Sequence, residues 1–125
     1  MKLESVVRPG VFWVEVDESL AEAASKMQFE EIGSLAVLQQ GRFVGIITER
    51  DLVRAIADGV DAASIPVAKY MTADPIVASP DDGTQEAAAR MLVLGVRHLP
   101  VVVGGEVVGM VSIRDLLEES ALAGH

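Results

Sequence analysis

Two stretches with nearly the same pattern lie 64 residues apart in this chain. Residues 45–51 read GIITERD, and residues 109–115 read GMVSIRD. The match extends without gaps on both sides of these stretches. Equivalent pairs include Asp17 and Asp81, Met27 and Met91, and Gly41 and Gly105. Self-similarity at a fixed spacing over this length indicates an internal duplication.

The hydrophobic periods and turn residues predict the same elements in both copies. Each repeat is predicted to run β-α-β-β-α, and the first helix of the first copy begins with a capping box of Ser19 and Glu22. Predicted strands are 11–16, 35–38, 43–48, 75–79, 99–103 and 107–112, and helices follow Ser19, Thr48, Thr84 and Ser112. The fold class is therefore expected to be α+β.

One repeat of about 50 residues buries too little surface to be stable alone. We therefore expect two repeats packed sheet to sheet around a pseudo-two-fold axis, with two equivalent clefts. The expected boundaries are 1–60 for the first repeat with its lead-in, 61–73 for a linker and 74–125 for the second repeat. Together they are expected to form one globular module.

The composition excludes several classes of function. The net charge of −9 disfavours binding to nucleic acid or to an anionic membrane, because both need clustered Lys and Arg. The chain has no cysteine, which excludes disulfides and thiolate chemistry. No leader-like or membrane-spanning apolar segment is present, so a cytoplasmic location is expected.

The sequence does not predict an enzyme or a metal site. The two histidines are His98 and the terminal His125, and the paired acids Asp81-Asp82 and Glu118-Glu119 are interpreted as solvated charges at a helix start and a helix end. No nucleophile, base and carboxylates converge in the sequence. No group of residues has the spacing of metal ligands. We expect no catalytic residue and no required cofactor.

The hydroxyl-x-x-Asp pattern has two interpretations. A hydroxyl residue followed three positions later by an acid caps a helix. Here the acid is the short Asp in both copies, Thr48 with Asp51 and Ser112 with Asp115, which suits a second task of accepting hydrogen bonds from ribose hydroxyls. One carboxylate has enough acceptor sites for both tasks.

Arg97 and His98 precede a predicted strand and also have two interpretations. A charged pair at this place is either a solvated strand end or a contact for a phosphate. The equivalent residues in the first repeat, Gly33 and Ser34, carry no charge, so the two clefts are expected to differ. A histidine with an ordinary pKa is mostly neutral at pH 7, which argues against tight triphosphate binding.

Together these motifs resemble a pair of CBS domains, a Bateman module, over nearly the whole chain. The resemblance rests on the two G-h-h-[S/T]-x-x-D stretches, where h is an apolar residue, on residues 97–101 (RHLPV) and on residues 70–75 (YMTADP). It implies a stand-alone regulatory sensor that binds AMP, ADP, ATP or S-adenosylmethionine and modulates an unidentified partner protein. It also implies a homodimer.

The resemblance also implies which residues bind the ligand. In one cleft, Thr48 and Asp51 would face Arg97 and His98 of the other repeat. The adenine there would contact Ile46, Ile76, Val77, Ala78, Val96 and Pro100. The second cleft would use Ser112, Asp115, Met110, Trp13, Val14 and Ser34, with Arg8 or Arg114 for a phosphate. For most of the apolar residues, and for Trp13, plain core packing is the competing interpretation.

A second function stays open beside the sensor. The apolar excess of the chain would also suit a ligand-independent dimerisation or interaction module with vestigial clefts. The uncharged Gly33 and Ser34 favour this alternative.

Overall fold

The computed structural model describes residues 1–7 and 10–123, with the backbone alone for 121–123. The chain divides into two compact units, Phe12–Pro75 on the one hand, and Met1–Val11 with Ile76–His125 on the other. Within the described residues, every helix is too short or too polar to cross a lipid bilayer.

The first unit contains a four-stranded sheet and two helices. Its elements are β1 (Trp13–Glu15), α1 (Leu20–Glu30), β2 (Ser34–Gln39), β3 (Arg42–Thr48), α2 (Glu49–Ala57), the 3-10 helix η2 (Val67–Lys69) and β4 (Thr72–Ala73). The strand order is β1-β2-β3-β4. Strand β1 runs parallel to β2, and the other pairs are antiparallel. The short strand β4, which the sequence did not predict, extends this sheet beyond β3.

Local chemistry explains where these elements begin and end. The backbone amide of Glu22 donates a hydrogen bond to the Ser19 hydroxyl at 3.1 Å, which confirms the predicted cap of α1. The helix ends at Glu30, and the next residue, Glu31, caps it with a left-handed φ of 57°. Gln40 and Gly41 both have positive φ, as a tight two-residue hairpin requires.

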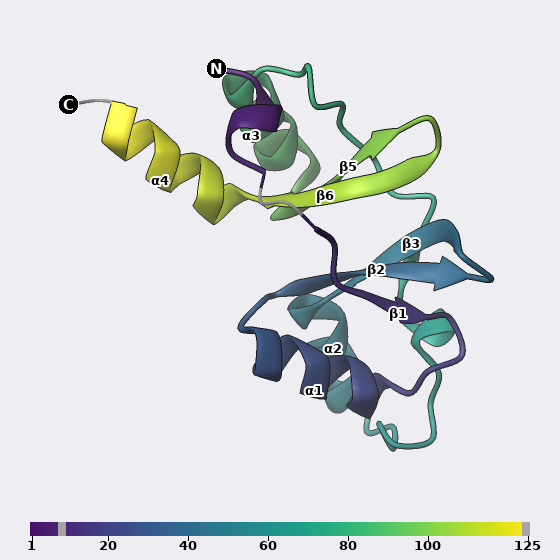
Figure 1. Cartoon of the computed structure of the whole chain (residues 1–125). Coiled ribbons are helices and arrows are strands. Elements are labelled where there is room, and N and C mark those ends of the chain that lie inside the picture. The colour runs from purple at the N-terminus through teal and green to yellow at the C-terminus, as the bar shows by residue number, and fades with distance from the viewer. Residues whose placement is uncertain (8–9, 124–125) are drawn as a thin grey trace. The chain divides into compact units, whose positions relative to one another are not determined.

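The apolar faces of the strands and helices of the first unit form one core. Helices α1 and α2 both lie against the sheet (Figure 1). The buried core residues are Val14, Leu20, Ala23, Met27, Leu35, Val37, Ile47, Ala55 and Val67. Val67 comes from the segment after α2, so that segment is part of the same packed unit.

The second unit repeats this plan with a smaller sheet. Its elements are the 3-10 helix η1 (Leu3–Ser5), α3 (Thr84–Leu94), β5 (His98–Val103), β6 (Glu106–Ser112) and α4 (Ile113–Ala123). Strands β5 and β6 pair antiparallel, with a register shift between Val101 and Val102 that matches the shift between Val37 and Leu38 in the first unit. Its buried core comprises Leu3, Ala78, Ala87, Met91, Leu99, Val101, Val111 and Leu116.

The prediction of a strand over residues 75–79 is wrong, because only a single parallel bridge between Ala78 and Val101 forms there. In the first unit, the amide of Ala36 donates to the carbonyl of Phe12 at 3.1 Å and extends the β1–β2 ladder. The residue equivalent to Ala36 is Pro100, which has no N–H to donate. The ladder is therefore reduced to the bonds on either side of Ala78.

The packing groups some segments differently from the sequence repeats. Residues 1–11, which the sequence places with the first repeat, belong to the unit of the second repeat, and residues 61–75 belong to the unit of the first. The α+β class built from a repeated strand–helix unit is confirmed. The repeat boundaries at residues 60 and 73 stay a prediction.

Candidate functional site

The first repeat places Thr48 and Asp51 where β3 ends and α2 begins. Ser34, the first residue of β2, lies opposite Thr48 in the antiparallel register. The amide of Glu49 donates to the carbonyl of Gly33 at 3.0 Å, which fixes the start of the helix to the start of β2. Residues that are distant in the sequence therefore meet at one strand-to-helix junction.

At this junction Asp51 is buried and both of its carboxylate oxygens are engaged. Its Oδ2 accepts hydrogen bonds from the Thr48 amide at 2.9 Å and from the Thr48 hydroxyl at 3.2 Å. Its Oδ1 lies 3.2 Å from Nη2 of Arg54, and the residue as a whole is 7% exposed. The capping interpretation therefore holds for Asp51, and the structure adds an ion pair that the sequence analysis missed.

Arg54 is held against Asp51 by Tyr70. Its Nη2 donates to the Tyr70 carbonyl at 3.2 Å, and its guanidinium lies 5.8 Å from the centre of the Tyr70 ring. The Tyr70 hydroxyl donates to Asp58 at 2.7 Å, and this hydrogen bond raises the pKa of Tyr70 above its ordinary value of 10.0. Asp51, Arg54, Tyr70 and Asp58 thus form one connected polar cluster in the first unit.

The second repeat builds the equivalent junction between β6 and α4. His98 lies opposite Ser112, and the amide of Ile113 donates to the carbonyl of Arg97 at 2.8 Å. The two basic residues singled out in the sequence therefore lie at this helix start of their own repeat. His98 is half-buried and Arg97 is exposed.

Asp115 has fewer partners than Asp51. Its Oδ2 accepts from the Ser112 amide at 3.3 Å, and its own amide donates to the Ser112 hydroxyl at 3.0 Å. Among the described residues, none donates to Oδ1 of Asp115. Asp115 is half-buried, so this helix start combines a cap with a partly exposed carboxylate, one oxygen of which has no donor in the part of the chain that the structure describes.

The apolar candidates divide by exposure. Trp13, Ile76, Val77 and Val96 are exposed to between 37% and 50%, so they are available for contact with a ligand. Val14, Ile46, Ala78 and Pro100 are buried in their units, and Met110 is half-buried. Trp13 is also covered on one face by Lys26, whose ammonium lies 5.3 Å from its ring and donates to its carbonyl at 2.7 Å. Arg8 lies outside the described residues.

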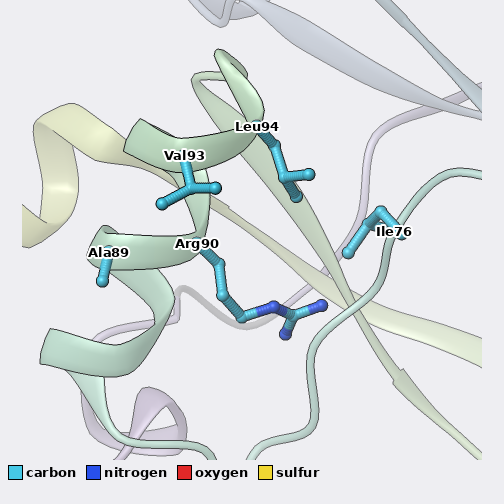
Figure 2. A pocket seen from close by; sticks show the side chains of 5 residues that line it. All are labelled: Ile76, Ala89, Arg90, Val93 and Leu94. Carbon is cyan, nitrogen blue, oxygen red and sulfur yellow. The ribbon is translucent and has the colours of Figure 1, made fainter.

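A pocket of about 390 Å³ lies in the second unit beside α3. Ala89, Arg90, Val93 and Leu94 line it from the helix, and Ile76 lines it from the preceding segment (Figure 2). The Arg90 guanidinium already donates to the Val77 carbonyl at 3.0 Å and lies 3.7 Å from Asp82. Because its one charged side chain is committed to the protein, the pocket has no polar group placed to orient a ligand.

Sequence reasoning found the two acids but missed Arg54, Tyr70 and Asp58. The spacing of Asp51 and Arg54, three residues apart on a helix, indicates an ion pair. Tyr70 lies in the segment expected to link the repeats, and no local pattern indicates that it contacts α2. Among the described residues, no cluster of His, Asp and Glu has a metal-binding arrangement.

Comparison with known proteins matches both repeats. The model of the CBS domain matches residues 3–58 and 67–122. An uncharacterised 17.7 kDa protein of Acidianus ambivalens is 44% identical over 117 residues, which cover 92% of this chain and 70% of that protein. The chain spans less of some other relatives, such as 41% of the uncharacterised protein MJ1225 of Methanocaldococcus jannaschii, which is 27% identical.

The structural comparison agrees with the sequence comparison. The CBS domain protein PAE2072 of Pyrobaculum aerophilum, solved in complex with AMP, has a TM-score of 0.86 at 26% identity, covering 98% of this chain and 99% of that one. The chain therefore belongs to the CBS domain family and carries two CBS domains.

Proposed function

We propose that this chain is a regulatory module that binds an adenosine-containing small molecule and thereby modulates a partner protein. The candidate ligands are AMP, ADP, ATP and S-adenosylmethionine. The proposed role is regulatory rather than catalytic, and the proposed assembly is a homodimer. Membership of the CBS family and the AMP bound to the Pyrobaculum relative support this choice of ligand class.

The observation that supports the proposal most is Oδ1 of Asp115 at the start of α4, which accepts a hydrogen bond from none of the described residues. A ribose offers two adjacent hydroxyl donors, and an ionised carboxylate is a strong acceptor for them. The backbone amides at the start of an 11-residue helix also favour an anion. His98, the first residue of β5, lies opposite Ser112, and the carbonyl of Arg97 accepts from the amide of Ile113, so the backbone of these two residues lies at the same junction. A phosphate bound there would have the Arg97 charge available on the same segment.

The proposed ligand residues are those that the resemblance implied. The two junctions would contribute Thr48, Asp51, Ser112 and Asp115, with Ser34, Arg97 and His98 beside them. The apolar contacts would come from the exposed Trp13, Ile76, Val77 and Val96. The buried members of the set, such as Val14 and Pro100, would support these residues from the core without touching the ligand.

A thermal-shift panel of the four ligands tests this proposal. A ligand at one hundred times its dissociation constant adds about 2.7 kcal/mol to the free energy of unfolding, which raises the melting temperature measurably. We expect at least one ligand to stabilise the wild type and to lose its effect in Asp115→Ala. Asp17→Ala, which removes an exposed acid, is the matched control. A panel without any stabilising ligand would contradict the proposal.

The second candidate is a ligand-independent interaction module. Large apolar side chains recur at equivalent exposed positions of the two repeats. Phe29 and Val93 are 84% and 85% exposed, and Val53 and Leu117 are 64% and 63% exposed. Repeated exposed apolar positions are typical of interaction surfaces. Light scattering with and without AMP separates the two functions, because this candidate predicts the same assembly in both conditions.

A further inference from the structure

The two helix-start acids differ in how many hydrogen bonds they can still accept. A carboxylate offers about four acceptor sites on its two oxygens. Asp51 already receives two donors from Thr48 and one from Arg54, which leaves about one site. Among the described residues, Asp115 receives one donor, from the Ser112 amide. A ribose diol needs two acceptor sites, so it fits Asp115 as the protein stands but does not fit Asp51.

The charge three residues after the acid is reversed between the repeats. Arg54 follows Asp51 at this spacing, and Glu118 follows Asp115. Glu118 pairs instead with Arg114, its Oε1 lying 3.4 Å from Nε of that residue. A carboxylate has no proton to donate when ionised, so Glu118 cannot occupy the acceptor sites of Asp115.

Arg54 is fixed in this position by more than the ion pair. The Tyr70 carbonyl accepts from the same nitrogen that approaches Asp51, and the Tyr70 ring packs against the guanidinium. The Asp58 carboxylate in turn fixes the Tyr70 hydroxyl.

We infer that Arg54 is a specificity-determining residue that competes with the ribose for Asp51, so that the ligand binds preferentially at Asp115. The inference rests on the proposed function. It predicts one strong site in the chain rather than two equal sites. It also assigns the difference in ribose binding between the two sites to one side chain, Arg54. This effect is separate from the difference in basic residues at the starts of β2 and β5.

A reciprocal exchange of the two charges tests this inference. Arg54→Glu gives the first repeat the acidic residue that the second repeat has at this position. Glu118→Arg gives the second repeat the arginine of the first. The probe is adenosine, because it is uncharged and a new arginine cannot attract it through a phosphate. The readout is isothermal titration, which gives both the number of sites and their dissociation constants.

The expected results are opposite for the two variants. The wild type binds one adenosine, and Asp115→Ala loses this binding. Arg54→Glu gains a second site or tightens a weak one by about tenfold, which corresponds to one charge-assisted hydrogen bond. Glu118→Arg weakens the existing site by about tenfold. Arg54→Lys, which keeps a positive charge beside Asp51, stays close to the wild type.

The control ligand is 2′,3′-dideoxyadenosine, which has no diol. Its binding should respond to neither exchange, whereas a merely structural effect of the variants would change both ligands alike. Glu118 is an exposed side chain, so Glu118→Arg is informative even if Arg54→Glu does not fold.

Two negative outcomes can be told apart. If adenosine binds but neither exchange changes the number or strength of sites, the inference about Arg54 is wrong and the proposed function stands. If neither adenosine nor any of the four ligands of the panel binds to the wild type or to any variant, the proposed function fails and the inference fails with it.

Discussion

The backbone amide of Leu3 donates a hydrogen bond to the carbonyl of Asp82 at 2.9 Å, so the first residues of the chain are anchored to the segment before α3. The amide of Thr84 returns a bond to the Met1 carbonyl at 3.0 Å. The Leu3 side chain is fully buried in the core of the second unit. The N-terminal segment therefore completes the packing of residues that follow it by about eighty positions.

Leu3→Ala should destabilise the second unit by about 2–4 kcal/mol. The substitution removes a buried side chain and leaves a cavity, which is the usual cause of a loss of this size. Urea unfolding followed by circular dichroism measures the change. Leu117→Ala is the matched control, because Leu117 is 63% exposed and its loss should cost less than about 0.5 kcal/mol. Equal effects of the two substitutions would contradict this packing.

Gly45→Ala should weaken the pairing of β3 with β4. A Cβ at position 45 would overlap the backbone carbonyl of Thr72 and lie 3.3 Å from the Met71 sulfur. A backbone atom cannot move as easily as a side-chain end, so we expect a loss of about 1–3 kcal/mol. Thermal unfolding measures it. A stability equal to that of the wild type would show that β4 is free to shift.

Gly83→Ser is a glycine substitution that should not destabilise the protein, in contrast to Gly45→Ala. It copies Ser19 of the first repeat to the N-cap of α3, where the backbone already has the extended conformation of a cap. It should leave the stability unchanged or raise it by a few tenths of a kcal/mol.

Tyr70 should titrate above its ordinary pKa. It is the only tyrosine of the chain, so the ultraviolet absorbance of tyrosinate reports on this residue alone. The hydrogen bond to Asp58 favours the protonated hydroxyl and raises its pKa above 10.0. The stability that this bond contributes is present below pH 10 and is lost as the pH rises through the raised pKa.

Asp58→Ala removes the acceptor and should return the midpoint of the tyrosine titration to about 10. A midpoint that is the same in the wild type and in Asp58→Ala would contradict the contact.

Asp51→Ala should destabilise the free protein more than Asp115→Ala. Asp51 is buried and provides a cap, a bond to the Thr48 hydroxyl and an ion pair, whereas Asp115 provides a cap. Losing a cap costs about 1 kcal/mol, and the further contacts should raise the loss for Asp51 to about 2 kcal/mol. Chemical unfolding without ligand measures both. A larger loss for Asp115→Ala would reverse our assignment of their roles.

Much of the fold could be predicted from the sequence because it is recorded twice. The duplication and the capping box gave the helices, and the turn glycines gave the hairpins. The strand over residues 75–79 could not be predicted correctly from its own residues, because it fails at Pro100 in a different strand. The anchoring of Leu3 and the short strand β4 depend in the same way on partners that are distant in the chain.

The candidate site, too, could be predicted only in part from the sequence. The acids Asp51 and Asp115 could be found because motif and spacing mark them in both copies. Their difference could not be found, because it depends on how Arg54 is held by Tyr70, a residue outside the repeated pattern. The exposed and buried members of the apolar set could be separated only from their burial in the folded units, and Ile76, Val77 and Val96 lie outside the strands.

Isothermal titration of AMP into the wild type and into Asp115→Ala tests the central proposal most directly. We expect the wild type to bind AMP and the variant, once circular dichroism shows that it is folded, to bind AMP at least ten times more weakly. Equal affinity of the two proteins for AMP, or a wild type that binds neither AMP nor any of the other three adenosyl ligands, would contradict the proposed function.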